Sequence, residues 1–248
     1  MAFAYCVAKL KLFASISATD AKPRNVSRKS MKTPLTIFIL FFSLQVFSQN
    51  NREENDVIKE MCIEFSETKN LSDTLRVDNI YNKYLYPYLL KFERQKAESI
   101  GKSLYFRLQR ECEEFSKFLD RIEPQENWTE LNEMPESQLS ESELNEFIKK
   151  GNFHYLEGNG EKTIVKIIDG FWIDQFPDKT TSKNKIIWKK NNVFELEFIE
   201  SNNEARNGFS RKGDRYYYKI INIENNYYNI ASKIPNQNRV FVFKLYFN

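Results

Sequence analysis

The second half of the chain alternates apolar and polar residues, which is the pattern of strands that bury one face. From Gly151 onward, the alternating runs are separated by short turn sequences rich in Asn, Asp and Gly. Short turns between consecutive strands predict an antiparallel meander, which at this length forms a small up-and-down barrel or a curled sandwich. The expected strands are 152–158, 162–168, 171–176, 183–190, 193–201, 214–224, 227–234 and 239–247.

The same alternation assigns side chains to the two faces of each strand. Phe194, Leu196 and Phe198 are expected on one face, with Glu195 and Glu197 on the other. Turns are expected where Asn, Asp and Gly tolerate the left-handed backbone of tight hairpins. These positions are 159–160, 169–170, 191–192, 212–214 and 225–226.

Residues 50–122 have the three-to-four-residue period of amphipathic helices instead. Ser72 offers an N-cap to one helix, which Pro87 is expected to kink or end. A longer helix is expected over 90–122, with Gly101 as a weak point within it. This part of the chain therefore predicts a helical domain.

Between the two regions the composition changes to Glu, Gln, Ser, Asn and Pro, which predicts a polar linker over 123–145. A short helix is expected over 140–149, because Ser140 and Glu143 have the spacing of a capping box. The predicted fold class is α+β. It consists of a helical segment at 50–122, the linker, and an antiparallel β domain at 146–248 that forms a lipocalin-like barrel or a curled sandwich.

Residues 31–48 have the order of a secretory signal peptide. Lys32 provides the positive start, 35–42 the apolar core, and Ser48 a small residue before the expected cleavage at Gln49. The apolar run is shorter than the roughly 20 residues that span a bilayer, so a permanent membrane anchor is disfavoured. The expected location is the periplasm or the exterior.

Residues 1–30 precede this signal, although a signal peptide acts from an N-terminus. They are interpreted as a non-native extension from a start codon placed too early, or as a targeting extension, since they are basic and contain several serines. Residues 1–48 hold seven basic residues and one acid, so without them the net charge changes from +3 to −3. A nearly neutral exported chain gives no reason to expect a nucleic-acid partner.

An oxidising compartment favours a disulfide between Cys62 and Cys112, which remain after Cys6 is excluded. Each of the two lies on an apolar helical face, and the alternative is a pair of buried free thiols. Two cysteines and the distant His154 are too few for a zinc site, and no cofactor motif is present, so neither a metal nor a cofactor is expected.

The single histidine, His154, restricts the enzyme hypotheses, because no nucleophile motif accompanies it. Paired carboxylates hydrolyse glycosides, and Asp169, Asp174 and Glu195 lie among aromatic residues. Acidic residues are so frequent here that such pairings arise by chance. A hydrolase is therefore the third-ranked function.

Aromatic residues of the β region are the candidate ligand-binding residues. Trp172 and Trp188 lie on neighbouring strands, and both approach one interior if the sheet curls with its apolar face inward. Tyr216 and Tyr218 share a face that Tyr217 cannot share. We expect these two tryptophans and two tyrosines to contact a ligand.

The runs SKNKIIWKKNNVFELEFIES and KGDRYYYKIINIENNYYNIAS resemble the C-terminal β domain of uncharacterised small exported bacterial proteins. In those proteins a Ser-x-x-x-Ile-x-Trp strand precedes a Glu-Leu strand, a Gly-Asp turn and a Tyr-rich hairpin. Some carry the name DNA topoisomerase IV, which does not fit a short exported chain without the motifs of that enzyme. The resemblance covers about 100 residues and implies a lipocalin-like β meander without a known activity.

The sequence thus predicts an exported, non-enzymatic binding protein whose β domain holds a small apolar ligand or an envelope partner. The alternative is a structural or interaction protein that acts through its helical segment. A deep interior lined by Trp and Tyr favours the first hypothesis, and a filled core beside an exposed apolar helical stripe favours the second.

Overall fold

The computed structural model describes residues 39–124 and 126–247, which divide into two compact units between Leu104 and Tyr105. The division falls within helix α5 (Arg94–Glu111), whereas the sequence suggested a boundary near residue 122. The second unit therefore contains the end of α5 and helix α6 as well as the β domain.

Within residues 39–104, the regular elements of the first unit are all helices. Its elements are α2 (Ile39–Glu67), α3 (Asp73–Ile80), a π-helical segment η2 (Tyr81–Leu85), α4 (Tyr86–Leu89) and the first part of α5. Ser72 is the N-cap of α3, as predicted, and accepts a hydrogen bond from the backbone N–H of Leu75 at 3.4 Å. Pro87 stands at the start of α4, which ends at Leu89, in agreement with the predicted end of this helix.

The single long helix expected over 90–122 is instead two helices, α5 and α6 (Glu113–Ile122). Cys112 separates them, with an extended backbone at φ −118° and ψ 99°. The apolar period continues through Cys112, so nothing in the sequence pattern marks this break. Gly101, expected to be the weak point, lies buried within α5.

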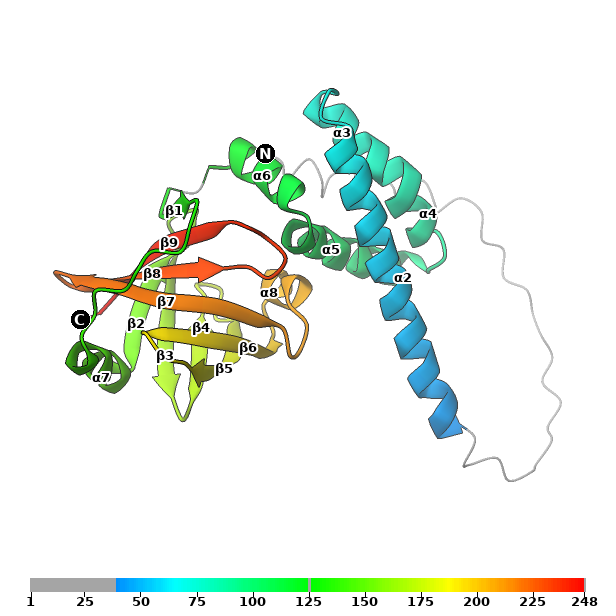
Figure 1. Cartoon of the computed structure of the whole chain (residues 1–248). Helices are drawn as coiled ribbons and strands as arrows, with labels where there is room; N and C mark the ends of the chain where they lie inside the picture. The colour runs from blue at the N-terminus through cyan, green and yellow to red at the C-terminus, as the bar shows by residue number, and fades with distance from the viewer. Residues whose placement is uncertain (1–38, 125, 248) are drawn as a thin grey trace. The chain divides into compact units, whose positions relative to one another are not determined.

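The second unit is built on a closed antiparallel barrel, so the α+β class and the lipocalin-like β meander are confirmed. Figure 1 shows strands β2 to β9 following one another around the barrel. The strands of the barrel are β2 (Asn152–Leu156), β3 (Lys162–Ile168), β4 (Phe171–Gln175), β5 (Thr181–Trp188), β6 (Val193–Ser201), β7 (Arg215–Glu224), β8 (Tyr227–Lys233) and β9 (Val240–Tyr246).

Strand β9 closes the barrel. It pairs with β8 along its whole length and with β2 at Tyr246, where the partner is His154. Beside β2, the start of β9 pairs with an additional strand, β1 (Trp128–Leu131). Closure removes free strand edges, which distinguishes this fold from the curled sandwich that the sequence left open.

The hairpin turns form where they were expected. Asp169 and Gly170 have φ values of 52° and 77°, and Asn191 and Asn192 have 59° and 60°. Positive φ at both central residues is the geometry of the tight turns that match the twist of antiparallel strands. The turns rich in Asn, Asp and Gly between apolar runs therefore predicted the strand boundaries closely.

The stretch 123–145, expected to be a polar linker, contributes structure to the barrel. It contains β1 and leads into α7 (Glu141–Lys150). The predicted capping box is present, because Ser140 accepts from the backbone of Glu143, whose carboxylate accepts from the Ser140 backbone N–H at 2.8 Å. Helix α7 therefore begins at the predicted capping box, and it covers one end of the barrel.

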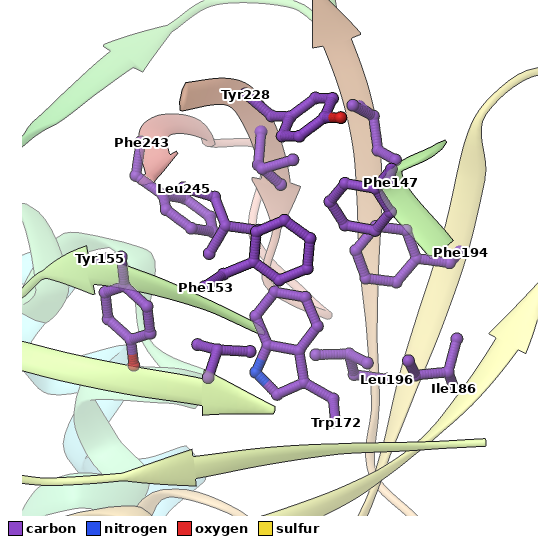
Figure 2. Close-up of a cluster of buried hydrophobic side chains, with 13 residues drawn as sticks. Phe147, Phe153, Tyr155, Trp172, Ile186, Phe194, Leu196, Tyr228, Phe243 and Leu245 are labelled. Carbon is purple, nitrogen blue, oxygen red and sulfur yellow. The ribbon is translucent and has the colours of Figure 1, made fainter. Parts of the chain in front are cut away.

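The end of the barrel under α7 is filled by a hydrophobic core, which Figure 2 shows. Phe147 of α7 is fully buried and stacks on Phe153 of β2, with ring centroids 4.8 Å apart. Its ring meets Tyr228 of β8 edge-on at 5.0 Å and Trp188 of β5 at 6.2 Å. Aromatic pairs of this kind add to the stabilisation from burial.

Helix α6 is joined to the barrel through Arg239, whose side chain is buried. Its guanidinium donates two hydrogen bonds to the Glu130 carboxylate, at 2.8 and 2.6 Å, and one to the Ser116 hydroxyl at 2.9 Å. It also forms an ion pair with Asp120 at 2.6 Å. A buried charge is stable only with such partners, so this cluster fixes α6 and β1 on β9.

The predicted signal peptide falls largely outside the described residues, since only 39–48 are described and these form the first turns of α2. The predicted extension 1–30 lies entirely outside them. Across the two described ranges, none of the helices has both the length and the apolar character that crossing a membrane requires.

Candidate functional site

The barrel end opposite α7 contains a cavity of about 340 Å³. At this end β2, β4, β6 and β8 finish and the strands that follow them begin. Helix α8 (Glu204–Phe209), in the connection between β6 and β7, contributes Ala205, Arg206 and Phe209 to the lining. The cavity volume lies at the lower end of the range of about 300–1,000 Å³ typical of small-molecule sites.

Aromatic side chains form much of the cavity wall. Trp172 and Tyr218 line it, and both stack on Phe194 of the underlying core, with centroid separations of 5.9 and 5.2 Å. Tyr216 also lines the cavity, stacks on Phe209 of α8 at 6.3 Å and shares a hydrogen bond of 2.6 Å with Ser210. These contacts hold the rings in fixed orientations, so the wall is preformed.

A strip of polar side chains interrupts this aromatic surface. Asp174 on β4 is directly opposite Ser182 on β5, and Trp172 is opposite Asn184, in the register of the two strands. All four side chains face the interior, and the three polar residues are at most 8% exposed. The Trp172 indole N–H donates a hydrogen bond of 2.8 Å to Oδ1 of Asp174.

Burial determines the protonation of Asp174. Removal from water raises the pKa of its carboxyl from 3.8 to about 6, although the hydrogen bond from Trp172 acts in the opposite direction. Arg206 also lowers this pKa, and Glu157 raises it further. The carboxyl is therefore ionised at neutral pH and becomes neutral in mildly acidic solution.

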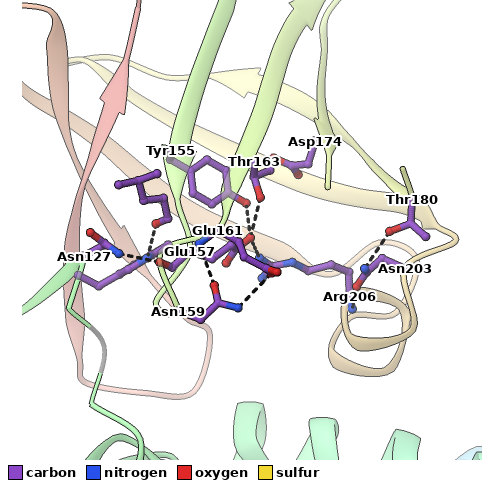
Figure 3. Close-up of polar contacts among 12 residues, drawn as sticks. Asn127, Tyr155, Glu157, Asn159, Glu161, Thr163, Asp174, Thr180, Asn203 and Arg206 are labelled. Carbon is purple, nitrogen blue, oxygen red and sulfur yellow. Dashed lines mark hydrogen bonds and ion pairs between the residues drawn. The ribbon is translucent and has the colours of Figure 1, made fainter. Parts of the chain in front are cut away.

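A second polar cluster, centred on Glu157, lies at the mouth of the cavity (Figure 3). One oxygen of Glu157, Oε1, accepts hydrogen bonds from Arg206 at 2.6 Å, Thr163 at 3.0 Å and Tyr155 at 3.1 Å. Arg206 belongs to α8, whereas the other three residues belong to β2, β3 and the turn between them. The cluster therefore joins α8 to the rim of the barrel.

Helix α8 has a further attachment at its start. Asn203 is its N-cap, accepting from the backbone N–H of Arg206 at 3.1 Å, and its amide donates to the Thr180 hydroxyl at 2.9 Å. Gly208 faces Phe106 of α5 so closely that an added Cβ would lie 2.7 Å from that ring. Both contacts keep α8 at the cavity mouth.

Three of the four aromatic residues predicted to contact a ligand line the cavity, namely Trp172, Tyr216 and Tyr218. Trp188 does not, because it packs against Phe147 at the filled end of the barrel. The inward direction of Trp188 was correctly read from alternation, but its position along the barrel axis places it at the other end. Tyr217 faces outward and is 37% exposed, as the alternation of β7 requires.

Ser182, Asn184 and Arg206 are not among the site residues predicted from the sequence, and Asp174 is considered there only as a hydrolytic carboxylate. A signal for Asp174, Ser182 and Asn184 is present in the sequence, since Trp172-x-Asp174 and Ser182-x-Asn184-x-Ile186 have the inward period of their strands. Polar residues at inward positions of a barrel indicate either a buried network or a binding site. Arg206 gave no such signal, because α8 was not predicted.

The acids considered for glycoside hydrolysis do not face one another. Asp174 points into the cavity, Glu195 lies on the outer face of β6 near Lys189 and Arg215, and Asp169 is in the turn between β3 and β4 at the other end. His154 lies on β2 and stacks on Tyr246 at 5.1 Å, and burial lowers its pKa. The geometry thus assembles no acid pair from these residues.

Cys62 and Cys112 form the predicted disulfide bond. Within residues 39–124 and 126–247 there is no group of three or more His, Cys, Asp or Glu side chains that is arranged to hold a metal ion. Comparisons of the chain with protein-family models, curated proteins and solved structures found no match.

Proposed function

We propose that this protein is an exported, non-enzymatic binding protein whose barrel holds a small ligand in the cavity under α8. The observation that carries this proposal is the cavity of about 340 Å³, with its aromatic wall and its strip of buried polar groups. Ligand sites are concave, mostly apolar, and contain a few placed polar groups that fix orientation.

The contrast between the two ends of the barrel supports this proposal. Under α7 the interior is filled by packed aromatic and aliphatic side chains. Under α8 it is open, although a cavity and incompletely hydrogen-bonded polar groups both lower the stability of a fold. A binding role gives a physical reason for that cost, because a ligand would fill the space and complete the hydrogen bonds.

Export is proposed on three grounds. The disulfide between Cys62 and Cys112 is typical of an oxidising compartment. Residues 31–48 have the order of a signal peptide, and the resemblance to the β domain of small exported bacterial proteins suggests the same location. The periplasm and the exterior both fit these features.

Tryptophan fluorescence tests the binding site directly. Trp128 and Trp172 line the cavity, whereas Trp188 lies at the filled end. A panel of fatty acids, quinones and aromatic dyes is titrated into the purified protein, with emission and melting temperature as readouts. A ligand that enters the cavity changes the emission and raises the melting temperature by mass action.

Variants locate the response. Trp188→Phe should retain the change in emission, and the double variant Trp128→Phe/Trp172→Phe should lose it. Ser182→Phe fills the cavity and should abolish binding, whereas Lys183→Phe, one residue further along β5 on the outer face, should not. Binding that persists unchanged in a folded Ser182→Phe variant would place the ligand elsewhere and contradict the proposal.

An interaction role is the second candidate, with the helical unit as the contact surface. It is favoured by Ile63, Leu75 and Leu90, apolar side chains of that unit that are 41–64% exposed. This role predicts that the purified protein self-associates or cross-links to an envelope protein, and that Leu75→Ser/Leu90→Ser abolishes the association. A monomeric protein with no cross-linked partner would argue against it.

A further inference from the structure

Asp174 retains a free acceptor in the cavity. Its Oδ1 accepts from the Trp172 indole, and Oδ2 has no hydrogen-bond donor among the described residues. The side chain is more than nine-tenths buried and lines the cavity. This oxygen is open to the cavity, so the site is suited to a ligand that supplies a donor.

The residues across the strand pair extend this site. Ser182 is directly opposite Asp174, and Asn184 is two residues further along β5 on the same inward face. Neither side chain makes a hydrogen bond to any residue in the described ranges, and both are over nine-tenths buried in the cavity wall. Together the three residues present several acceptors to one small region of the cavity.

The other charged groups around the cavity are already paired or exposed. Glu157 accepts three hydrogen bonds at one oxygen, including the one from Arg206, and Asp120 is paired with Arg239. Lys233 lines the cavity but is exposed to solvent at its rim. Within the described residues, Asp174 is therefore the one buried charge of the cavity that lacks an opposite charge in direct contact.

The wall around Asp174 suits a cation. The faces of Trp172 and Tyr218 carry the negative potential of aromatic rings, and Tyr218 is held by its stacking on Phe194 at 5.2 Å. An ammonium group near these rings gains cation–π attraction in addition to the hydrogen bond with the carboxylate. A ligand carboxylate would instead face the buried charge of Asp174.

We infer that the ligand is a small primary amine with an apolar body, bound with its ammonium group on Asp174 and its body along the aromatic wall. This inference rests on the proposed binding function and adds the chemical class of the ligand. The cavity volume of about 340 Å³ accommodates a molecule of the size of an arylalkylamine.

Three compounds of matched size test the inference by calorimetry at pH 7.5 on the purified full chain. They are 2-phenylethylamine, 2-phenylethanol and phenylacetate, which differ in the charge of one terminal group. We expect the amine to bind at least about tenfold more tightly than the alcohol, since charge-assisted hydrogen bonds are roughly twice as strong as neutral ones. Phenylacetate should bind most weakly.

The outcomes separate the inference from the proposed function. Equal or weaker binding of the amine relative to the alcohol would overturn the amine assignment and leave the cavity as a binding site. If neither these compounds nor the wider panel bind at all, the proposed function itself fails, and the inference with it. The comparison is made on the unmodified protein, so it does not depend on a variant that folds.

A matched pair of variants then assigns the selectivity to one carboxylate. Asp174→Asn keeps the shape of the side chain and the acceptor for the Trp172 indole but removes the charge. This variant should bind 2-phenylethylamine and 2-phenylethanol with about equal affinity. Asp169→Asn changes an exposed aspartate at the opposite end of the barrel, where Asn tolerates the positive φ of 52°. It should leave the preference unchanged. A preference that survives in Asp174→Asn would exclude Asp174 as the recognition group.

Discussion

Asp174 provides a quantitative test of how the cavity is solvated. The pKa of its carboxyl is raised from 3.8 to about 6 by burial, so the folded protein holds this proton more tightly than the unfolded chain. Stability from this group is therefore fully present below pH 3.8 and is lost as the pH rises through the window from 3.8 to about 6. The difference in pKa corresponds to about 3 kcal/mol.

Asp174→Asn removes this titration and keeps an oxygen that accepts from the Trp172 indole. The stability gained by the variant, relative to the unmodified protein, should rise between pH 4 and pH 7 by up to about 3 kcal/mol. The titratable groups facing Asp174 are Tyr155, Glu157, Tyr218 and Arg206. Burial raises the pKa of both tyrosines, so neither ionises in this window.

Urea unfolding at intervals of half a pH unit measures the effect. The difference between the two proteins isolates Asp174, because carboxyls with lowered pKa, such as Glu113 and Glu130, contribute equally to both. Asp169→Asn, at an exposed turn position, serves as the control for the loss of one carboxylate elsewhere on the barrel. A difference for Asp174→Asn that does not change with pH would show that water or a neighbouring cation solvates the carboxylate, and it would refute the reasoning.

Three further substitutions test the packing of the molecule. Phe147→Ala should lower the free energy of unfolding, measured by chemical denaturation, by about 3–5 kcal/mol, because this fully buried ring fills the barrel end under α7. The control Ile148→Ala changes a side chain that is 40% exposed and should lower the free energy of unfolding only slightly. Gly208→Ala should lower the free energy of unfolding by about 1–3 kcal/mol, since the new Cβ would lie 2.7 Å from the Phe106 ring. The double variant Gly208→Ala/Phe106→Leu should regain part of that stability. Cys112→Ala should lower stability by up to about 4 kcal/mol, and a reducing agent should then have no further effect; two alkylatable thiols in the native unmodified protein would contradict the disulfide.

The strands were predictable because a half-buried strand has a period of two residues and its tight turns have a restricted chemistry. The ends of β3, β6 and the turn at Asp169 and Gly170 agree closely with the sequence pattern. Strand β1 was missed because it is a four-residue element in a polar stretch, and its partner β9 lies far along the chain. Pairing over such a distance leaves no local signal.

The candidate site was predictable only in part, for a geometrical reason. Alternation shows that Trp172 and Trp188 face inward, but it does not give their height along the barrel axis. In the register of the sheet Trp172 is opposite Asn184, and Trp188 lies further along β5 toward the filled end. Whether an interior is filled also depends on helices that cover its ends, and α8 is too short to produce a clear helical period.

The closure of the barrel by β9 has a consequence for the order of folding. This strand is translated after all the others, yet it supplies the partner for the free edges of both β2 and β8. Until it arrives, the growing sheet exposes two unpaired edges, which are templates for pairing with other chains. Contacts between β2 and β9 also span most of the β domain in sequence, and such distant pairings form slowly. The newly made chain therefore passes through an aggregation-prone interval, and a chaperone that covers exposed edges would act on it during that interval.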